Sequence, residues 1–180
     1  YTGSHDTKFS VVRYGNVMGS RGSVIPFFLT VAKKGTLPIT DNRMTRFMIT
    51  LEEGVDLVWE AFDDMIGGEI YVRKIPSMKV TDVAKSVSDT ARQEVVGIRP
   101  GEKLHEQMIG PEDAIYTYEY PEYYKILPSI NNWSKDPHRI KNGKKVPENF
   151  LYSSDNNKEW MEIYELRDWI KNNKNKIGNI

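Results

Sequence analysis

The order of apolar and polar residues predicts a strand, a loop and a helix within the first 34 residues. Residues 9–14 (FSVVRY) are rich in β-forming residues around an apolar centre, as in a buried strand of a parallel sheet. Residues 15–22 contain three glycines, and residues 23–34 form a candidate helix that Ser23 can cap. A strand, a glycine loop and a helix make half of a β-α unit, which predicts an α/β fold.

A second helix is predicted over residues 51–65 by a stripe of apolar positions. Leu51, Val55, Val58, Phe62 and Met65 follow one another at spacings of four, three, four and three. This spacing is typical of a helix face that packs against the protein interior. Residues 69–72 form a candidate strand, and we expect it to share one largely parallel sheet with residues 9–14.

The elements after residue 75 are shorter and their patterns are weaker. Tyrosines crowd residues 116–124, a cluster that favours packing or an oligomer surface over a platform for stacking bases. The remaining predictions are a helix at 81–90, a strand at 94–98, a helical turn or two at 103–108, a strand at 124–127, a polar surface excursion at 131–149 and a helix at 161–171.

Composition excludes several classes of function. The 180 residues carry 25 basic and 25 acidic side chains, so a general binder of nucleic acids or membrane surfaces is disfavoured. No apolar run approaches the roughly 20 residues that cross a bilayer. Cysteine is absent, which excludes disulfide frameworks, thiolate zinc sites and cysteine nucleophiles, and the three histidines show no metal-binding spacing.

The charge is unevenly distributed along the chain. Residues 1–50 hold seven basic and two acidic side chains, whereas residues 51–72 hold seven acidic side chains and no basic one. One interpretation is a solvated acidic helix beside basic loops. The other is that the basic loops collect an anionic ligand.

The best candidate for a ligand site is the glycine loop at residues 15–22. A loop of this kind exposes backbone N–H groups and the positive end of a helix to an anion, and Arg21 adds a charge. An ordinary connection with glycines for tight packing is the alternative. Asn16 follows the strand, where ligands of open α/β sheets sit, but it could equally be a turn residue.

Three further residues are candidates for a ligand site. Arg99 could bind phosphate and Glu102 could bind ribose hydroxyls, because the Pro100-Gly101 turn projects its flanking side chains to one side. Arg46 belongs to the basic loops and lies immediately before the acidic helix. The alternatives are an ion pair for Arg46 and a surface turn with a local salt bridge for the other two. His105 is better explained as a surface helix residue than as a catalyst.

No set of catalytic groups is evident in the sequence. Ser/His/Asp sets, paired carboxylates at a defined spacing, Tyr-x-x-x-Lys, G-x-G-x-x-G and P-loop motifs are all absent. Because the sequence opens with Tyr1 rather than Met, we expect it to be part of a longer protein. A sheet that lacks its first strands would leave an open edge and exposed apolar helix faces.

Taken together, five blocks resemble the second half of one enzyme family, the inverting UDP-N-acetylglucosamine 4,6-dehydratases. These are extended short-chain dehydrogenases/reductases of pseudaminic acid biosynthesis, and capsule-sugar dehydratases are close relatives. The resemblance covers residues 7–170. It rests on the blocks SVVRYGNVMGSRGSVIPFF, LPITDNRMTRFMIT, GGEIYVRKIPSMKVTDVA, GIRPGEKLHE and FLYSSDNN.

The resemblance implies the C-terminal part of a Rossmann-type parallel sheet and a smaller, mixed substrate-binding lobe. Residues 1–75 would end the Rossmann-type domain, with segments of the lobe interleaved, and residues 76–180 would form the lobe and a C-terminal extension. The implied full-length enzyme is cytoplasmic, uses NADP, forms homo-oligomers and has neither nucleic acid nor membrane as a partner. Its catalytic residues would lie in an N-terminal half that this sequence lacks.

The implied reaction converts UDP-N-acetylglucosamine to a UDP-4-keto-6-deoxy-hexose with inversion at C5. A capsule-sugar dehydratase/epimerase relative and a non-catalytic sugar-nucleotide-binding module are the alternatives. By resemblance, the substrate contacts are Asn16 to the sugar nucleotide, Val24 to the substrate, Thr40 to the uracil through its backbone, Arg46 to the ribose or diphosphate, Arg99 to the diphosphate and Glu102 to the ribose, and the cofactor contacts are Tyr14 and Val17.

Overall fold

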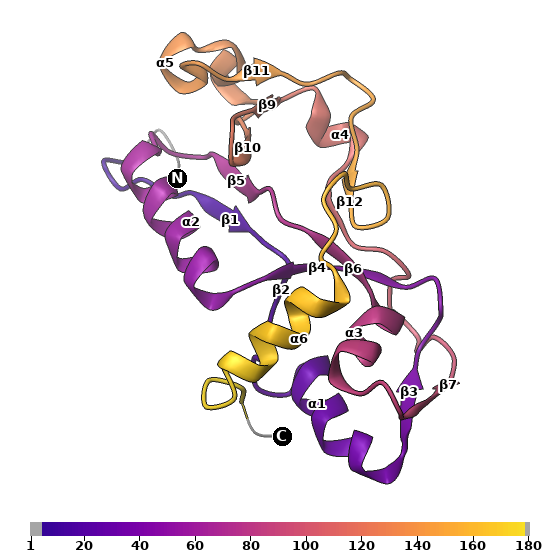
Figure 1. The fold of residues 1–180 in the computed structure, drawn as a ribbon. Coiled ribbons are helices and arrows are strands. Elements are labelled where there is room, and N and C mark those ends of the chain that lie inside the picture. The colour runs from indigo at the N-terminus through magenta and orange to yellow at the C-terminus, as the bar shows by residue number, and fades with distance from the viewer. Residues whose placement is uncertain (1–4, 179–180) are drawn as a thin grey trace. The chain divides into compact units, whose positions relative to one another are not determined.

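The computed structural model describes residues 5–178, and their backbone divides into two interleaved units (Figure 1). Unit 1 comprises residues up to 14, 51–74 and 107–153. Unit 2 comprises residues 15–50, 75–106 and those from 154 onward. The chain passes from unit 1 to unit 2 after residue 74, and residues 107–153 belong to the same unit as residues 5–14. The division into domains at residue 75 stays a prediction.

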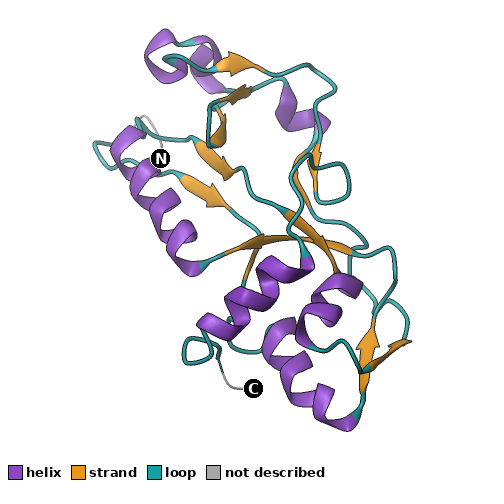
Figure 2. Ribbon diagram, in the orientation of Figure 1, coloured by secondary structure: helices purple, strands orange, loops and turns teal. Residues whose placement is uncertain are grey.

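Unit 1 is built on a five-stranded sheet in the order β1-β5-β10-β9-β11. The predicted pairing of residues 9–14 with residues 69–72 in one sheet is confirmed, since β1 and β5 pair in parallel. The other neighbours in this sheet are antiparallel, so the sheet is mixed rather than largely parallel. Helix α2 (Leu51–Asp64) is the long helix of this unit (Figure 2). The strands are β1 (Val11–Arg13), β5 (Ile70–Arg73), β9 (Thr117–Glu119), β10 (Tyr123–Ile126), β11 (Lys144–Lys145) and the separate antiparallel pair β8 (Gln107–Ile109) and β12 (Tyr152–Ser153).

Short helices and packed tyrosines complete unit 1. Tyr120 and Tyr123 stack with their ring centroids 4.8 Å apart, and Tyr118 and Tyr124 are buried, so most of the tyrosine cluster packs inside this unit. The predicted surface excursion at 131–149 contains short helices and one strand. The helical segments of this part of the chain are α4 (Pro111–Ala114), the 3-10 helix η2 (Ile130–Lys135) and α5 (Pro137–Ile140).

Strand β1 is less buried than its apolar sequence predicts. It lies at the edge of the sheet, with β5 as its one neighbour in the described chain. Val11 is 52% exposed, and Phe9 and Tyr14 are also exposed. The apolar sequence therefore marks a strand that is not covered on both faces within residues 5–178.

Helix α2 buries a different face from the one its apolar stripe predicts. Its buried residues are Gly54, Leu57 and Ala61, and Leu57 and Ala61 pack with Tyr71 of β5. Small side chains here allow the helix to lie close to the aromatic rings of the sheet. Of the predicted stripe, only Met65 joins this cluster. The exposed apolar residues of the helix and its end are Leu51, Val55, Val58, Trp59, Phe62 and Ile66.

The acidic segment at residues 51–72 is not simply solvated. Glu60 pairs with Arg73 at 2.7 Å, Asp64 pairs with Lys125 at 2.7 Å, and buried Glu69 pairs with buried Arg139. Since the basic partners come from other parts of unit 1, acidic residues of this segment help to hold β10 and α5 to it.

Unit 2 combines two small sheets with three longer helices. β2 pairs in parallel with β4, β4 pairs antiparallel with β6, and β3 pairs in parallel with β7. A single apolar core joins residues of α1, β3, β4, α3 and α6, including Phe28, Leu37 and Leu166. The elements are β2 (Asn16–Val17), α1 (Val24–Val31), the 3-10 helix η1 (Ala32–Lys34), β3 (Thr36–Ile39), β4 (Thr45–Ile49), β6 (Ser77–Lys79), α3 (Val80–Val87), β7 (Arg92–Val95) and α6 (Ile163–Asn172).

Residues 103–106 do not form the predicted helical turn. The Leu104 carbonyl accepts a hydrogen bond from the Thr45 backbone N–H at 3.1 Å, so this segment follows β4. β8 begins directly afterwards at Gln107. A bond to a neighbouring strand has replaced the bonds that a local helix would make.

Two absences hold for residues 5–178. None of their helices combines the length and the hydropathy that a membrane span requires. Within the same range, no group of three or more histidine, aspartate or glutamate side chains is arranged to hold a metal ion.

Candidate functional site

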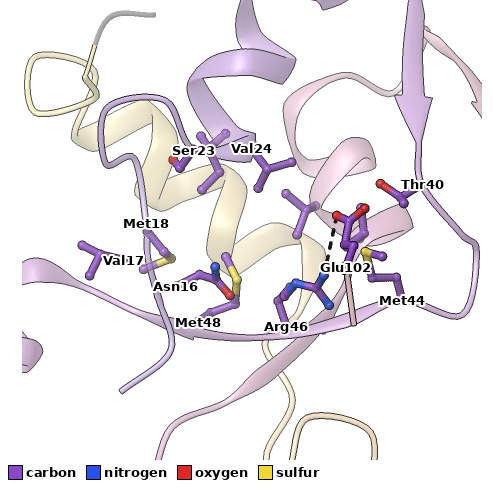
Figure 3. Close-up of a pocket in the computed structure, with 13 residues that line it drawn as sticks. Asn16, Val17, Met18, Ser23, Val24, Thr40, Met44, Arg46, Met48 and Glu102 are labelled. Atoms are coloured by element: carbon purple, nitrogen blue, oxygen red, sulfur yellow. Dashed lines mark ion pairs between the residues drawn. The ribbon is translucent and has the colours of Figure 1, made fainter. Parts of the chain in front are cut away.

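A pocket of about 160 Å³ lies within unit 2 (Figure 3). Its walls come from β2, the start of α1, β4, α3, the residue after β3 and the turn that carries Glu102. The lining residues are Asn16, Val17, Met18, Ser23, Val24, Ile25, Thr40, Met44, Arg46, Met48, Val80, Val83 and Glu102.

Six of the eight predicted site residues are brought together here. They are Asn16, Val17, Val24, Thr40, Arg46 and Glu102, which come from segments up to 86 positions apart in the sequence. The other two are not among the lining residues. Arg99 is exposed on the turn that leads to Glu102, and Tyr14 belongs to unit 1, where it is also exposed.

The turn at residues 99–102 has the geometry that its sequence predicts. The Glu102 N–H donates to the Arg99 carbonyl at 3.0 Å, and Gly101 has a φ of 81°. A positive φ at the third position defines a type II turn, in which glycine is favoured. The Arg99 N–H donates to the Glu102 carboxylate at 3.3 Å, so the turn also orients that carboxylate.

The Arg46 side chain is held mainly by backbone carbonyl groups. Its Nη1 donates to the carbonyls of Thr45 and Leu104, and its Nη2 donates to the Lys103 carbonyl at 2.9 Å. The same side chain lies between two carboxylates, 3.9 Å from Glu102 and 3.6 Å from Glu106. The predicted ion pair is therefore present, and the guanidinium fixes residues 103 and 104 against β4 through their carbonyl groups.

A buried polar network anchors the same segment from its other side. The Thr45 hydroxyl lies 2.8 Å from His105 Nδ1 and 2.7 Å from the Ser154 hydroxyl. The Glu106 backbone N–H donates to the Ser154 hydroxyl at 2.9 Å. His105 therefore has a partner in the fold, although it is not on a helix, and the network fixes the backbone from which Glu102 and Glu106 project.

Ser23 occupies the N-cap position of α1 without making the capping bond that the sequence predicts. Its hydroxyl oxygen is buried, and among residues 5–178 it has no hydrogen-bond partner. The first turn of α1 contains no acidic side chain. Ser23 therefore lines the pocket beside the positive end of a helix, and that end suits an oxygen-rich ligand.

The apolar wall of the pocket was not predicted from the sequence. Three methionines, Met18, Met44 and Met48, line it together with Val80 and Val83 of α3. Methionine adapts to irregular space and contacts flat ligands well. All three methionines lie inside the sequence blocks that carry the family resemblance, which is the one signal that could have identified them.

The size of the pocket limits what it can hold. A volume of about 160 Å³ is similar to that of a cavity that accepts one benzene ring. The pocket therefore suits one ring of a larger ligand, bounded by apolar side chains and edged by Asn16, Ser23, Arg46 and Glu102.

The described residues do not by themselves fit a dinucleotide cofactor. The two residues expected to contact it are Tyr14 and Val17, and neither side chain carries the positive charge that would offset a diphosphate. The sequence also lacks the G-x-G-x-x-G turn that places a dinucleotide on a helix N-terminus.

Residues 1–128 match the model of a family described as "Polysaccharide biosynthesis protein". Over 175 residues, 93% of this chain, the sequence is 50% identical to a UDP-N-acetylglucosamine 4,6-dehydratase (inverting) of Campylobacter jejuni, and it covers 52% of that protein. It is 37% identical over 172 residues to a UDP-glucose 4-epimerase of Rickettsia rickettsii, of which it covers 50%. The chain thus spans about half the length of these relatives.

A solved structure also matches almost the whole chain. It is titled "X-ray structure of Pen from Bacillus thuringiensis", and its sequence is 32% identical. The match has a TM-score of 0.80 and covers 96% of this chain and 52% of that one. The mixed α/β fold described above therefore recurs in about half of a larger protein.

Proposed function

Since this chain belongs to the polysaccharide biosynthesis protein family, we propose that it is the substrate-binding part of a nucleotide-sugar dehydratase. The full-length enzyme would convert UDP-N-acetylglucosamine to a UDP-4-keto-6-deoxy-hexose with inversion at C5. The relative that is 50% identical over 93% of the chain, a UDP-N-acetylglucosamine 4,6-dehydratase (inverting), supports this substrate and reaction.

The observation that carries the proposal is the convergence of six predicted ligand residues on one pocket. Asn16 comes from β2 and Val24 from the start of α1, Thr40 follows β3, and Arg46 and Glu102 come from β4 and the type II turn. Residues that served only in separate surface turns would have no reason to meet in one pocket, whereas residues that bind one ligand must do so.

In the proposed complex, each polar group has a task that fits its chemistry. The Glu102 carboxylate accepts hydrogen bonds from the two ribose hydroxyls, as a carboxylate acts only as an acceptor when ionised. Thr40 lies beside the uracil and contacts it through its backbone.

The diphosphate requires positive charge that Arg46 alone does not supply. Arg46 is shared between two carboxylates, Glu102 at 3.9 Å and Glu106 at 3.6 Å. Arg99 is exposed at the first position of the type II turn that carries Glu102. We assign the main phosphate contact to its guanidinium, which can donate two parallel hydrogen bonds.

The proposal extends to the full-length protein. It would use NADP, act in the cytoplasm and form a homo-oligomer. Tyr14 and Val17 would contact the cofactor, but the groups that hold its phosphates and carry out the chemistry would lie in the half of the relatives that this chain does not match. We assign the cofactor's redox chemistry to no residue of this chain.

Calorimetric titration with UDP tests the proposal directly. Arg99→Ala is expected to weaken UDP binding tenfold or more, about 1.4 kcal/mol, and Arg99→Lys is expected to restore only part of it because the bidentate fork is lost. Arg92→Ala on β7, an exposed arginine outside the pocket, is the matched control and should bind UDP like the parent. A parent chain that fails to bind UDP, or Arg99→Ala binding it normally, would count against the proposal.

A further inference from the structure

The amide of Asn16 has one end toward Glu106 and the other toward the pocket. With its nitrogen toward Glu106, the amide donates to the two carboxylate oxygens at 3.1 and 3.3 Å. The reverse orientation sets the amide oxygen against an ionised carboxylate that cannot donate. The nitrogen therefore belongs on the Glu106 side, and the carbonyl oxygen is the end left for a ligand.

Glu106 is fixed at both its main chain and its side chain. Its N–H donates to the Ser154 hydroxyl at 2.9 Å, and its carbonyl accepts from the Ser154 N–H at 2.8 Å. Its carboxylate accepts from the Phe47 backbone N–H and lies 3.6 Å from Arg46 Nε. A carboxylate held in this way cannot easily turn away from Asn16.

We propose that Glu106 is a positioning residue that holds the Asn16 amide with its carbonyl oxygen toward the ligand. Asn16 then acts as a hydrogen-bond acceptor for a hydroxyl or N–H group of the nucleotide sugar. This inference rests on the proposed function, because it names the polarity of a contact within the same site. The resemblance gives Asn16 a contact with the ligand but no polarity, and it gives Glu106 no task.

The proposed arrangement depends on the protonation of Glu106. A protonated carboxyl would donate to the amide oxygen, and the amide would turn its nitrogen toward the ligand. Burial raises the pKa of Glu106 above its ordinary value, while Arg46, the Phe47 N–H and Lys103 oppose that rise. The basic groups near the Glu106 carboxylate are Arg46 from β4 and Lys103 from the same segment as Glu106. Glu102 lies on another side of the Arg46 guanidinium, and the His105 ring is within hydrogen-bond distance of the Thr45 hydroxyl.

The side-chain amide resonance of Asn16 provides a test that needs no ligand. In the parent chain, the ¹⁵N and ¹H shifts of this group should titrate with the raised pKa of Glu106 as the pH is lowered from 8 to 4. In Glu106→Gln this titration should disappear. An Asn16 amide that titrates identically in both proteins would overturn the pairing.

Calorimetry with UDP-N-acetylglucosamine then tests the link to the ligand. This probe lacks the terminal phosphate whose second ionisation near pH 6 would obscure the result with UDP. Glu106→Gln should bind three- to tenfold more weakly at pH 8, the loss of about one hydrogen bond, and should lose the pH dependence of the parent. Asp168→Asn, an exposed carboxylate on α6, should match the parent.

A variant with a shorter acidic side chain separates the effect of positioning from the effect of charge. Glu106→Asp keeps the negative charge but does not reach the amide, so it should lose affinity as Glu106→Gln does. If the parent binds the ligand and both variants bind it equally well, Glu106 has no positioning task and the proposed function stands. If the parent does not bind the ligand, the proposed function fails, and the amide titration still decides whether Glu106 orients Asn16.

Discussion

At the scale of single residues, the least expected feature is the buried ammonium of Lys125. Its side chain is 1% exposed and pairs with Asp64 at 2.7 Å. Asp64 also accepts from the Tyr71 hydroxyl at 2.7 Å and from Lys141. Burial alone raises the pKa of Asp64, but the hydrogen bonds from Lys125, Lys141 and Tyr71 lower it to about 2.

Removing the Asp64 charge is expected to destabilise the chain strongly. Asp64→Asn would leave the Lys125 ammonium buried without a counter-charge, which costs about 3–5 kcal/mol. Urea unfolding at pH 7 measures this loss. Asp63→Asn, the neighbouring exposed carboxylate of α2, should change the free energy of unfolding by less than about 0.5 kcal/mol.

The pair of Asp64 and Lys125 also predicts how the free energy of unfolding depends on pH. The pKa of Asp64 is lower in the folded chain than its ordinary value of 3.8, so its contribution is complete above pH 4 and is lost as the pH falls toward 2. Unfolding measured between these values should therefore show a weaker pH dependence in Asp64→Asn. An unchanged acid profile would contradict the pairing.

At the scale of elements, two glycines that look alike in the sequence have opposite surroundings. A Cβ on Gly15 would lie 2.4 Å from Phe47 Cβ and 2.6 Å from the Phe47 carbonyl oxygen of β4. A Cβ on Gly54 of α2 would meet only the Tyr14 ring, at an ordinary contact distance of 3.9 Å. Gly15 is thus required where β2 approaches β4, whereas Gly54 occupies a helix position that tolerates alanine.

The two alanine substitutions should change stability in opposite directions. Gly54→Ala is expected to stabilise the chain by roughly 0.5–1 kcal/mol through helix propensity. Gly15→Ala is expected to destabilise it by about 1–3 kcal/mol because rigid backbone must move. The midpoint of urea unfolding measures both effects. Destabilisation by Gly54→Ala would mean that α2 packs more tightly than its contacts indicate.

At the scale of the whole molecule, the proposed binding pocket is present in a sequence that lacks two motifs of dinucleotide-dependent enzymes. The sequence lacks both G-x-G-x-x-G and Tyr-x-x-x-Lys. Unit 1 exposes the edge strand β1 and the apolar face of α2, including Trp59 and Phe62. This exposed surface agrees with the expectation for a sheet without its first strands, and contacts with further protein would cover it.

The isolated chain should therefore form no product from UDP-N-acetylglucosamine when NADP is added. Co-expression with a polypeptide that matches the N-terminal half of the Campylobacter relative should restore product formation, measured by mass spectrometry. Product formed by the 180-residue chain alone would show that the catalytic groups lie within it. UDP binding by that chain is the control that its pocket is folded.

Much of the local structure was predictable because it depends on neighbouring residues. The strand at 11–13, the helices that begin at Val24, Leu51 and Ile163, and the type II turn at Pro100-Gly101 all follow from propensity and turn chemistry. The segment at 103–106 was mispredicted because its hydrogen bonds go to β4, almost 60 residues away.

The sequence by itself determined the α/β class, most of the elements and, through its resemblance to a known family, six of the residues that line the pocket. The tertiary structure decided which face of α2 is buried, that most of the sheet in unit 1 is antiparallel, and that Arg99 stands outside the pocket lining. It alone placed Glu106 between Asn16 and Arg46. These features depend on which distant segments pack together, and periodicity along the chain does not encode the partner of a helix face or of a carboxylate.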